Sequence, residues 1–88
     1  MDFEWDSSKE RVNLRKHGIA FRTAARVFLD PYMIEFADLH PSGELRFNAI
    51  GLVDGRMLFV AYTMRGDTVR IISARGAEPR GKRKYHEV

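Results

Sequence analysis

The sequence predicts an α+β fold with two N-terminal helices, a four-stranded, mainly antiparallel sheet and a short C-terminal helix. Apolar residues recur with the helical period of about 3.6 before Asp30-Pro31 and with the strand period of two after it. Helices that precede a block of strands, instead of alternating with them, are typical of α+β proteins. The chain has 88 residues, of which 44% are hydrophobic, so we expect a single domain over residues 1–88.

The two N-terminal helices are predicted from their end signals and apolar spacing. Asp6 or Ser7 can cap a first helix that ends at His17, because Gly18 suits the left-handed conformation that terminates helices. A second helix is predicted over residues 21–28, where apolar side chains recur three, four and seven positions apart. Asp30-Pro31 should end it.

The remaining chain alternates with a period of two and predicts strands at residues 32–38, 44–53, 56–64 and 68–75. Asp54-Gly55 is typical of a two-residue hairpin, and Arg65-Gly66-Asp67 predicts a second tight turn. The last three strands should therefore form an antiparallel meander. Pro79 suits a first helical position but Gly81 disfavours a helix, so residues 78–88 predict a short or frayed helix.

Charge and composition limit the possible functions. The formal net charge is only +3, yet residues 64–88 carry seven Lys or Arg against three acidic residues. Such a segment suits a polyanion such as nucleic acid or an acidic partner, although a solvated surface explains it equally well. The chain has no Cys, which excludes disulfides and thiol chemistry. The acidic N-terminus and the lack of a long apolar run indicate a cytoplasmic protein.

Candidate phosphate-binding residues fall at several places. Lys16 and His17 share one side of the first helix with Lys9 and Asn13, where they could hold a phosphate or exchange a proton. A polar helix face is, however, more often simply solvated. The last segment combines Arg80 with Tyr85, a positive charge with a ring for base stacking, and a solvated tail is equally consistent.

Arginines also mark both ends of the predicted sheet. Antiparallel pairing should bring Arg46 and Arg65 together at one end, with Arg75 roughly 25 Å away at the other, so Arg65 and Arg75 cannot contact the same phosphate. The sequence does not say which end is functional. The three His lack metal-ligand spacing, and neither a glycine-rich phosphate loop nor a nucleophile turn is found. We therefore expect no metal and no cofactor.

An ordered set of motifs extends along nearly the whole chain. It comprises Trp5-Asp6, Lys9, Asn13, Lys16-His17-Gly18, the block from Val27-Phe28 to Asp30, Glu44-Leu45-Arg46, Gly51, Thr63 to Arg65, Ile71 to Arg75, and Tyr85. Together these motifs closely resemble the BrnT family of type II toxin–antitoxin toxins. The chain departs from the family at Gly76, Pro79 and Gly81-Lys82-Arg83, where the family usually has a helix with a Glu-Arg-Arg-like stretch.

The resemblance implies a RelE-like toxin domain, and an endoribonuclease that cleaves mRNA and inhibits translation. It also implies a BrnA-type antitoxin that neutralises the toxin in a hetero-oligomer and binds operator DNA. We expect the enzyme to be metal-independent, with attack by the 2′-hydroxyl on the phosphodiester. The sheet face left open by the helices, or a sheet edge, should be covered by this partner.

Cleavage of this kind needs a base, an acid, and cations that stabilise the phosphorane. The candidates for catalysis are Arg65, Arg75, His17 and Glu44, and those for RNA binding are Lys16, Arg46, Arg80 and Tyr85. Glu44 is an alternative base to His17, although pairing with Arg46 explains it better. The competing hypothesis is a non-catalytic basic module that binds nucleic acid or an acidic partner protein.

Overall fold

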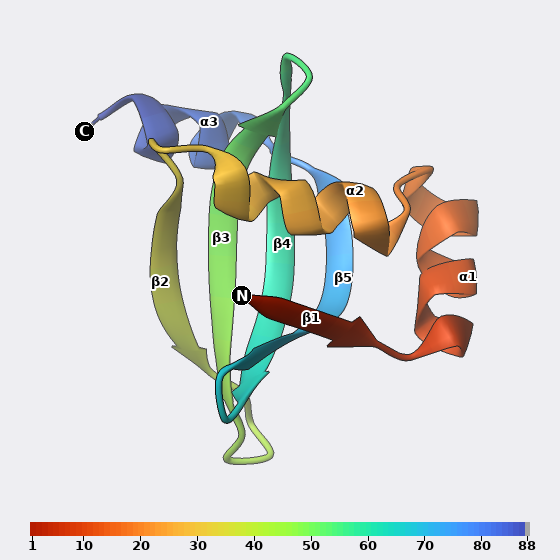
Figure 1. Cartoon of the computed structure of the whole chain (residues 1–88). Helices are drawn as coiled ribbons and strands as arrows, with labels where there is room; N and C mark the ends of the chain where they lie inside the picture. The colour runs from red at the N-terminus through yellow and green to blue at the C-terminus, as the bar shows by residue number, and fades with distance from the viewer. Residues whose placement is uncertain (88) are drawn as a thin grey trace.

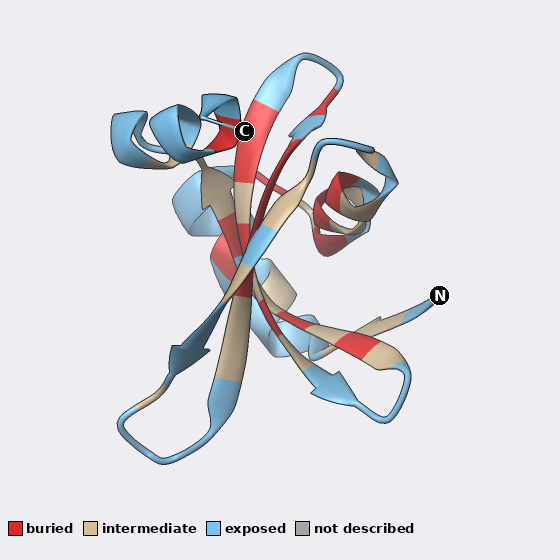
Figure 2. Cartoon of the chain, turned by 90° about the vertical axis from the view of Figure 1, so that its left-hand side faces the viewer, coloured by how far each residue is buried: buried red, intermediate tan, exposed pale blue. Residues whose placement is uncertain are grey.

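The computed structural model describes residues 1–87 and has one mixed sheet with helices on both of its faces (Figures 1 and 2). In chain order the elements are β1 (Asp2–Trp5), α1 (Ser7–His17), α2 (Phe21–Ala25), the 3-10 helix η1 (Arg26–Leu29), β2 (Ile34–Leu39), β3 (Leu45–Val53), β4 (Arg56–Arg65), β5 (Thr68–Gly76) and α3 (Pro79–His86). The strand order across the sheet is β1-β5-β4-β3-β2.

The predicted sheet of four mainly antiparallel strands after two N-terminal helices is wrong. The described chain begins with strand β1, which pairs in parallel with β5, so the structure is α+β with three α-helices and a five-stranded mixed sheet. The four residues of β1, DFEW, do alternate between polar and apolar, but a run this short is weak evidence of a strand. Its pairing partner, with Phe3 opposite Val69, also lies far along the chain.

The predicted boundaries of the first helix are confirmed. The Asp6 carboxylate accepts hydrogen bonds from the backbone N–H groups of Ser8 and Lys9, at 2.8 and 3.1 Å. Gly18 has a φ of 70° and its N–H donates to the carbonyl of Leu14. The second predicted helix is divided, because α2 ends at Ala25 and the chain continues as η1.

The predicted meander is confirmed, and a bulge within it decides which side chains of β5 face which way. Asp54 and Gly55 both have positive φ in the β3–β4 hairpin, and β4 pairs antiparallel with both β3 and β5. The register shifts by one residue in β5 between the partners of Ala61 and Tyr62. Ser73 and Arg75 are thereby directed to the opposite face from the buried Ala74.

Two clusters of buried side chains stabilise the sheet, one on each face. On the face covered by α2 and η1, buried Phe21, Ala24 and Val27 pack against the sheet. On the opposite face, Ile50, Met57 and Tyr85 form a smaller cluster beneath α3, and Figure 2 shows α2 and α3 on opposite sides of the sheet. A Cβ on Gly81 would lie 3.3 Å from Ile50 Cδ1. Glycine therefore lets α3 approach the sheet closely, and a regular helix forms despite it.

None of the helices within residues 1–87 is long and apolar enough to cross a membrane.

Candidate functional site

A pocket of about 430 Å³ lies between α3 and the sheet face beneath it. It is lined by Phe36 of β2, Ile50 of β3, Phe59 of β4, Arg75 of β5, and Glu78, Arg80, Gly81 and Lys84 at and within α3. We call it the α3 pocket. Residues from the last four strands and the last helix meet here because α3 returns across the sheet face (Figure 1).

Two cations of the α3 pocket lie over aromatic rings. The guanidinium carbon of Arg75 is 4.6 Å from the centroid of the Phe59 ring, and Nζ of Lys84 is 4.6 Å from that of Phe36. Such contacts orient a cation while leaving its N–H groups able to bind an anion. Arg80 also lines the pocket. The pocket thus places three positive charges beside two rings, which suits a phosphate and an adjoining base.

Glu78 is the one acidic residue among the described residues that line the α3 pocket. Its Oε1 accepts a hydrogen bond from Nη1 of Arg75 at 2.6 Å. The ion pair is exposed to solvent, with side-chain exposures of 39% for Arg75 and 72% for Glu78. An exposed pair of this kind is weak, so an incoming phosphate can replace the carboxylate on Arg75.

Lys16 and His17 are at the end of α1, beside the edge of β5 that faces away from β4. Together with Ile72 and Ser73 they line a shallow depression of about 390 Å³. Ser73 and Arg75 are two residues apart on one face of β5, so their Cα atoms are separated by about 7 Å. His17 and Arg75 therefore border the same short stretch of sheet, one reaching it from α1 and the other from beneath α3.

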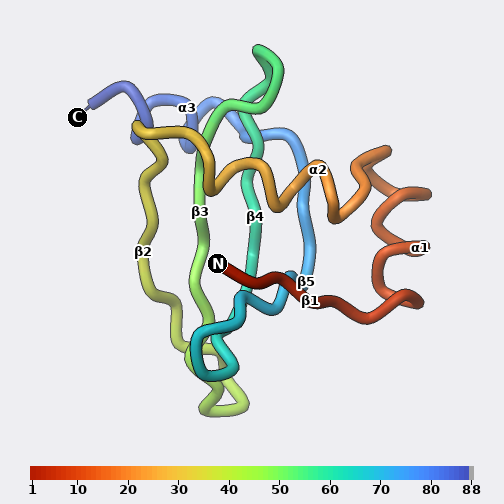
Figure 3. The backbone as a smooth tube through the Cα atoms, in the orientation of Figure 1, coloured from red at the N-terminus to blue at the C-terminus, as the bar shows by residue number. Residues whose placement is uncertain are grey.

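The predicted site residues Glu44, Arg46 and Arg65 lie at the opposite end of the sheet, by the β2–β3 and β4–β5 connections (Figure 3). Arg75 pairs with Phe59, six positions from Arg65 along β4. The separation is about 20 Å at ~3.3 Å per residue. Arg65 and Arg75 are thus too far apart to contact the same phosphate, as predicted from the sequence.

The arginines at this far end already have acidic partners. Arg46 Nε donates to Oε1 of Glu44 at 3.0 Å, which confirms the expected pairing. Arg65 and Arg70 each donate to Oε2 of Glu4 at 3.2 Å. Their charges are therefore more fully compensated than the charges of the α3 pocket.

Tyr85 is buried, with 8% of its surface exposed, so its ring is not presented for base stacking. Its hydroxyl donates to Oδ2 of Asp30 at 2.7 Å, and this oxygen also accepts from the backbone N–H of Leu52 at 2.8 Å. The Asp30 carboxylate raises the pKa of Tyr85 to about 12, with a further contribution from burial. Tyr85 thus anchors α3 to the end of η1 and so positions Arg80 and Lys84.

The sequence marked Asp30 as a helix end and as part of a family motif, but did not indicate its bonds to Leu52 and Tyr85. Burial disfavours its charged form, but hydrogen bonds from Leu52, Tyr85 and Tyr32 outweigh burial and lower the pKa of Asp30. Asn13, expected on a polar helix face, is instead buried, and its amide bonds to the backbone of Ile19 and Ala74. Only three-dimensional contacts distinguish these positions from ordinary capping or surface residues.

The two rings of the α3 pocket, Phe36 and Phe59, were also missed. Phe59 lies within a continuous apolar run in β4. Such a run does not show which side chains face α3 and which face α2 on the other side of the sheet. Among residues 1–87, no group of three or more His, Asp or Glu side chains is arranged to hold a metal ion.

A small α+β domain with a basic pocket that contains half-buried aromatic rings has the features of a protein that binds RNA. The family model described as "Ribonuclease toxin, BrnT, of type II toxin-antitoxin system" matches residues 5–80. The chain belongs to this family, which confirms the resemblance of its motifs. It is a ribonuclease toxin whose substrate is RNA and whose partner is an antitoxin. No curated protein matches the sequence.

Proposed function

We propose that the chain is a metal-independent endoribonuclease that cleaves mRNA in the cytoplasm and thereby inhibits translation, and that a BrnA-type antitoxin neutralises it. The observation that carries the proposal is the α3 pocket. There Arg75 lies over the Phe59 ring beside Arg80 and Lys84, so a phosphodiester can be held next to a stacked base.

The reaction needs no group beyond the RNA and the protein. A base takes the proton of a ribose 2′-hydroxyl, whose oxygen forms a bond to the neighbouring phosphorus. The bond from phosphorus to the 5′-oxygen breaks, and an acid gives that oxygen a proton. The products are a 2′,3′-cyclic phosphate and a 5′-hydroxyl. Negative charge builds up on the phosphorane between these steps, so a fixed cation accelerates them.

Arg75 is the best placed residue to stabilise the phosphorane in this proposal. Its guanidinium can donate two parallel hydrogen bonds to phosphate oxygens, a geometry that lysine cannot reproduce. His17 transfers the proton in this proposal, because its imidazole can both accept and donate a proton and lies beside Ser73, two residues from Arg75. Lys16 and Arg80 hold the phosphates on either side.

The far end of the sheet has a supporting role in the proposal. Arg65 is about 20 Å from Arg75, and Arg46 lies at the same end of the sheet as Arg65, so both contact phosphates further along a bound strand. Glu44 is a weaker candidate for the base than His17, because it pairs with Arg46. Tyr85 contributes by holding α3 in place, through its hydrogen bond to Asp30.

The proposal is tested by incubating the purified, antitoxin-free chain with RNA in the presence and absence of a chelator. We expect cleavage at the same rate in both samples, with 2′,3′-cyclic phosphate ends detected by mass spectrometry. Cleavage that the chelator abolishes would contradict metal independence. RNA that stays intact while it binds with a steep salt dependence would show a non-catalytic binding module instead.

Replacing Glu78 with glutamine separates two roles for this side chain. We expect RNA to bind about two- to threefold more tightly to Glu78→Gln, because Arg75 loses an exposed carboxylate that competes with phosphate. The cleavage rate at saturating RNA should stay the same. Glu87→Gln is the matched control, since it removes the same charge beyond the end of α3. A loss of cleavage of about 100-fold in Glu78→Gln alone would instead identify Glu78 as the base.

A further inference from the structure

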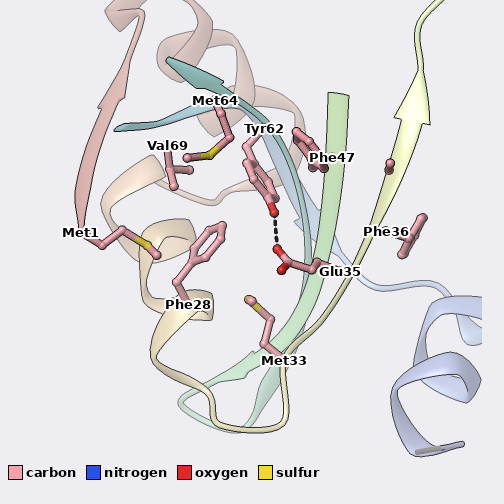
Figure 4. Close-up of a pocket in the computed structure, with 10 residues that line it drawn as sticks. Met1, Phe28, Met33, Glu35, Phe36, Phe47, Tyr62, Met64 and Val69 are labelled. Atoms are coloured by element: carbon pink, nitrogen blue, oxygen red, sulfur yellow. Dashed lines mark hydrogen bonds between the residues drawn. The ribbon is translucent and has the colours of Figure 1, made fainter. Parts of the chain in front are cut away.

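A second hollow lies on the face of the sheet that carries η1, beside β2. Its volume is about 490 Å³, and Figure 4 shows Phe28, Met33, Phe47, Tyr62 and Met64 around it. We call it the β2 groove. From the sequence, the partner is expected to cover a sheet face that the helices leave open, or a sheet edge. The β2 groove lies on the same face as α2 and η1, in a part that neither helix covers.

The apolar surface extends beyond the β2 groove along the β2–β3 pair. Ala37 pairs with Phe47 and Leu39 pairs with Leu45, so all four side chains face the same way as the groove. Leu39 is 70% exposed and Leu45 is 50% exposed. From Met33 to Leu39 this strip is roughly 20 Å long. A helix of about 13 residues has this length.

One charged residue lies within this apolar surface. Glu35 is the only residue with a charged side chain among those of the described chain that line the β2 groove, and its Oε2 accepts the Tyr62 hydroxyl at 2.5 Å (Figure 4). Burial and the adjacent carboxylate raise the pKa of Tyr62 well above its ordinary value, so the phenol remains a donor. Tyr62 therefore fixes one carboxylate oxygen and leaves the other for a partner.

We infer that the β2 groove binds an amphipathic helix of the antitoxin, whose apolar side chains fill the groove while one Lys or Arg pairs with Glu35. The charge complements Glu35, and flexible methionines such as Met33 and Met64 adapt readily to the side chains of a helix. The inference rests on the proposed function, because it names where the antitoxin binds. Phe36 lines both the β2 groove and the α3 pocket, so a helix in the groove borders the same edge strand as the α3 pocket, on the opposite face of the sheet.

The purified toxin–antitoxin pair allows a direct test with three toxin variants. We expect Met64→Glu and Glu35→Arg to weaken antitoxin binding at least tenfold, measured by calorimetry. Leu14→Glu is the matched control, because Leu14 is 43% exposed on α1 and Met64 is 41% exposed. It should change the affinity less than twofold. Circular dichroism and thermal melts verify that each variant is folded.

Two further measurements identify the occupant. A benzophenone amino acid at position 64 should crosslink to antitoxin residues spaced three or four apart, close to a Lys or Arg. Changing that Lys or Arg to Glu should restore binding to Glu35→Arg. Crosslinks to every second residue of a strand, or to a second copy of the toxin, would overturn the inference, as would unaltered affinity of both groove variants.

Failure of this inference can be told apart from failure of the proposed function. RNA cleavage by free Met64→Glu should match the wild-type rate within twofold, since Met64 lies outside the catalytic residues proposed above. If the free wild-type toxin leaves RNA intact, the proposed ribonuclease mechanism is wrong. The binding results still show whether the antitoxin binds the β2 groove. If wild-type toxin cleaves RNA and the groove variants bind antitoxin normally, only the groove assignment fails.

Discussion

Arg75→Ala should lower the rate of RNA cleavage at saturating substrate roughly 100- to 1,000-fold, the usual cost of removing one group that stabilises an anionic transition state. The reason is that Arg75 is the strand-end arginine of the α3 pocket, held over the Phe59 ring. Arg75→Lys keeps the charge but loses the two-pronged geometry, so it should recover only part of the activity. Single-turnover cleavage of a labelled RNA measures both effects.

The matched control for this variant is Arg22→Ala. Arg22 is exposed on α2, on the other face of the sheet, and its loss changes the net charge equally. It should leave the rate within twofold of the wild type. Arg65→Ala is the informative comparison, since it should weaken RNA binding and reduce the slope of log affinity against log salt by about 0.7 without lowering the maximal rate. If Arg65→Ala abolishes cleavage while Arg75→Ala does not, the catalytic end of the sheet is the opposite one.

Local signals predicted much of this fold because they act over a few residues. The Asp6 cap, the Gly18 terminator and the Asp54-Gly55 hairpin each depend on neighbouring backbone, and each is present. Strand β1 was missed because its pairing with β5 is parallel and distant in sequence. The bulge in β5 was missed for a related reason, since it is visible only against the partner strand. Both omissions concern long-range pairing, which local periodicity does not encode.

The candidate site was predictable in its charges but not in its assembly. Arg75 and Arg80 were both named from the sequence, and they meet in one pocket only because α3 returns across the sheet. The rings of Phe36 and Phe59 could not be assigned to this pocket, because the sequence does not show which face of the sheet an apolar strand residue occupies. Tyr85 shows the converse case. It was assigned to RNA through its ring, whereas in the structure its hydroxyl ties α3 to Asp30.

Asn13→Ala should destabilise the domain by about 3 kcal/mol or more, because it leaves buried backbone groups without partners. The Asn13 amide donates to the carbonyls of Ile19 and Ala74, both at 2.9 Å, and accepts from the Ala74 N–H at 3.0 Å. Urea unfolding should show the loss. RNA cleavage should also fall under conditions where the variant is folded, because these bonds hold the end of α1 with Lys16 and His17 against β5. Asn48→Ala is the matched control, since Asn48 is 9% exposed against 5% for Asn13 and lies on β3, outside the contact between α1 and β5. Asn48→Ala should lower the free energy of unfolding by less than about 1 kcal/mol. Equal losses of stability in the two variants would show that burial of the asparagine, and not its hydrogen bonds between α1 and β5, determines the effect.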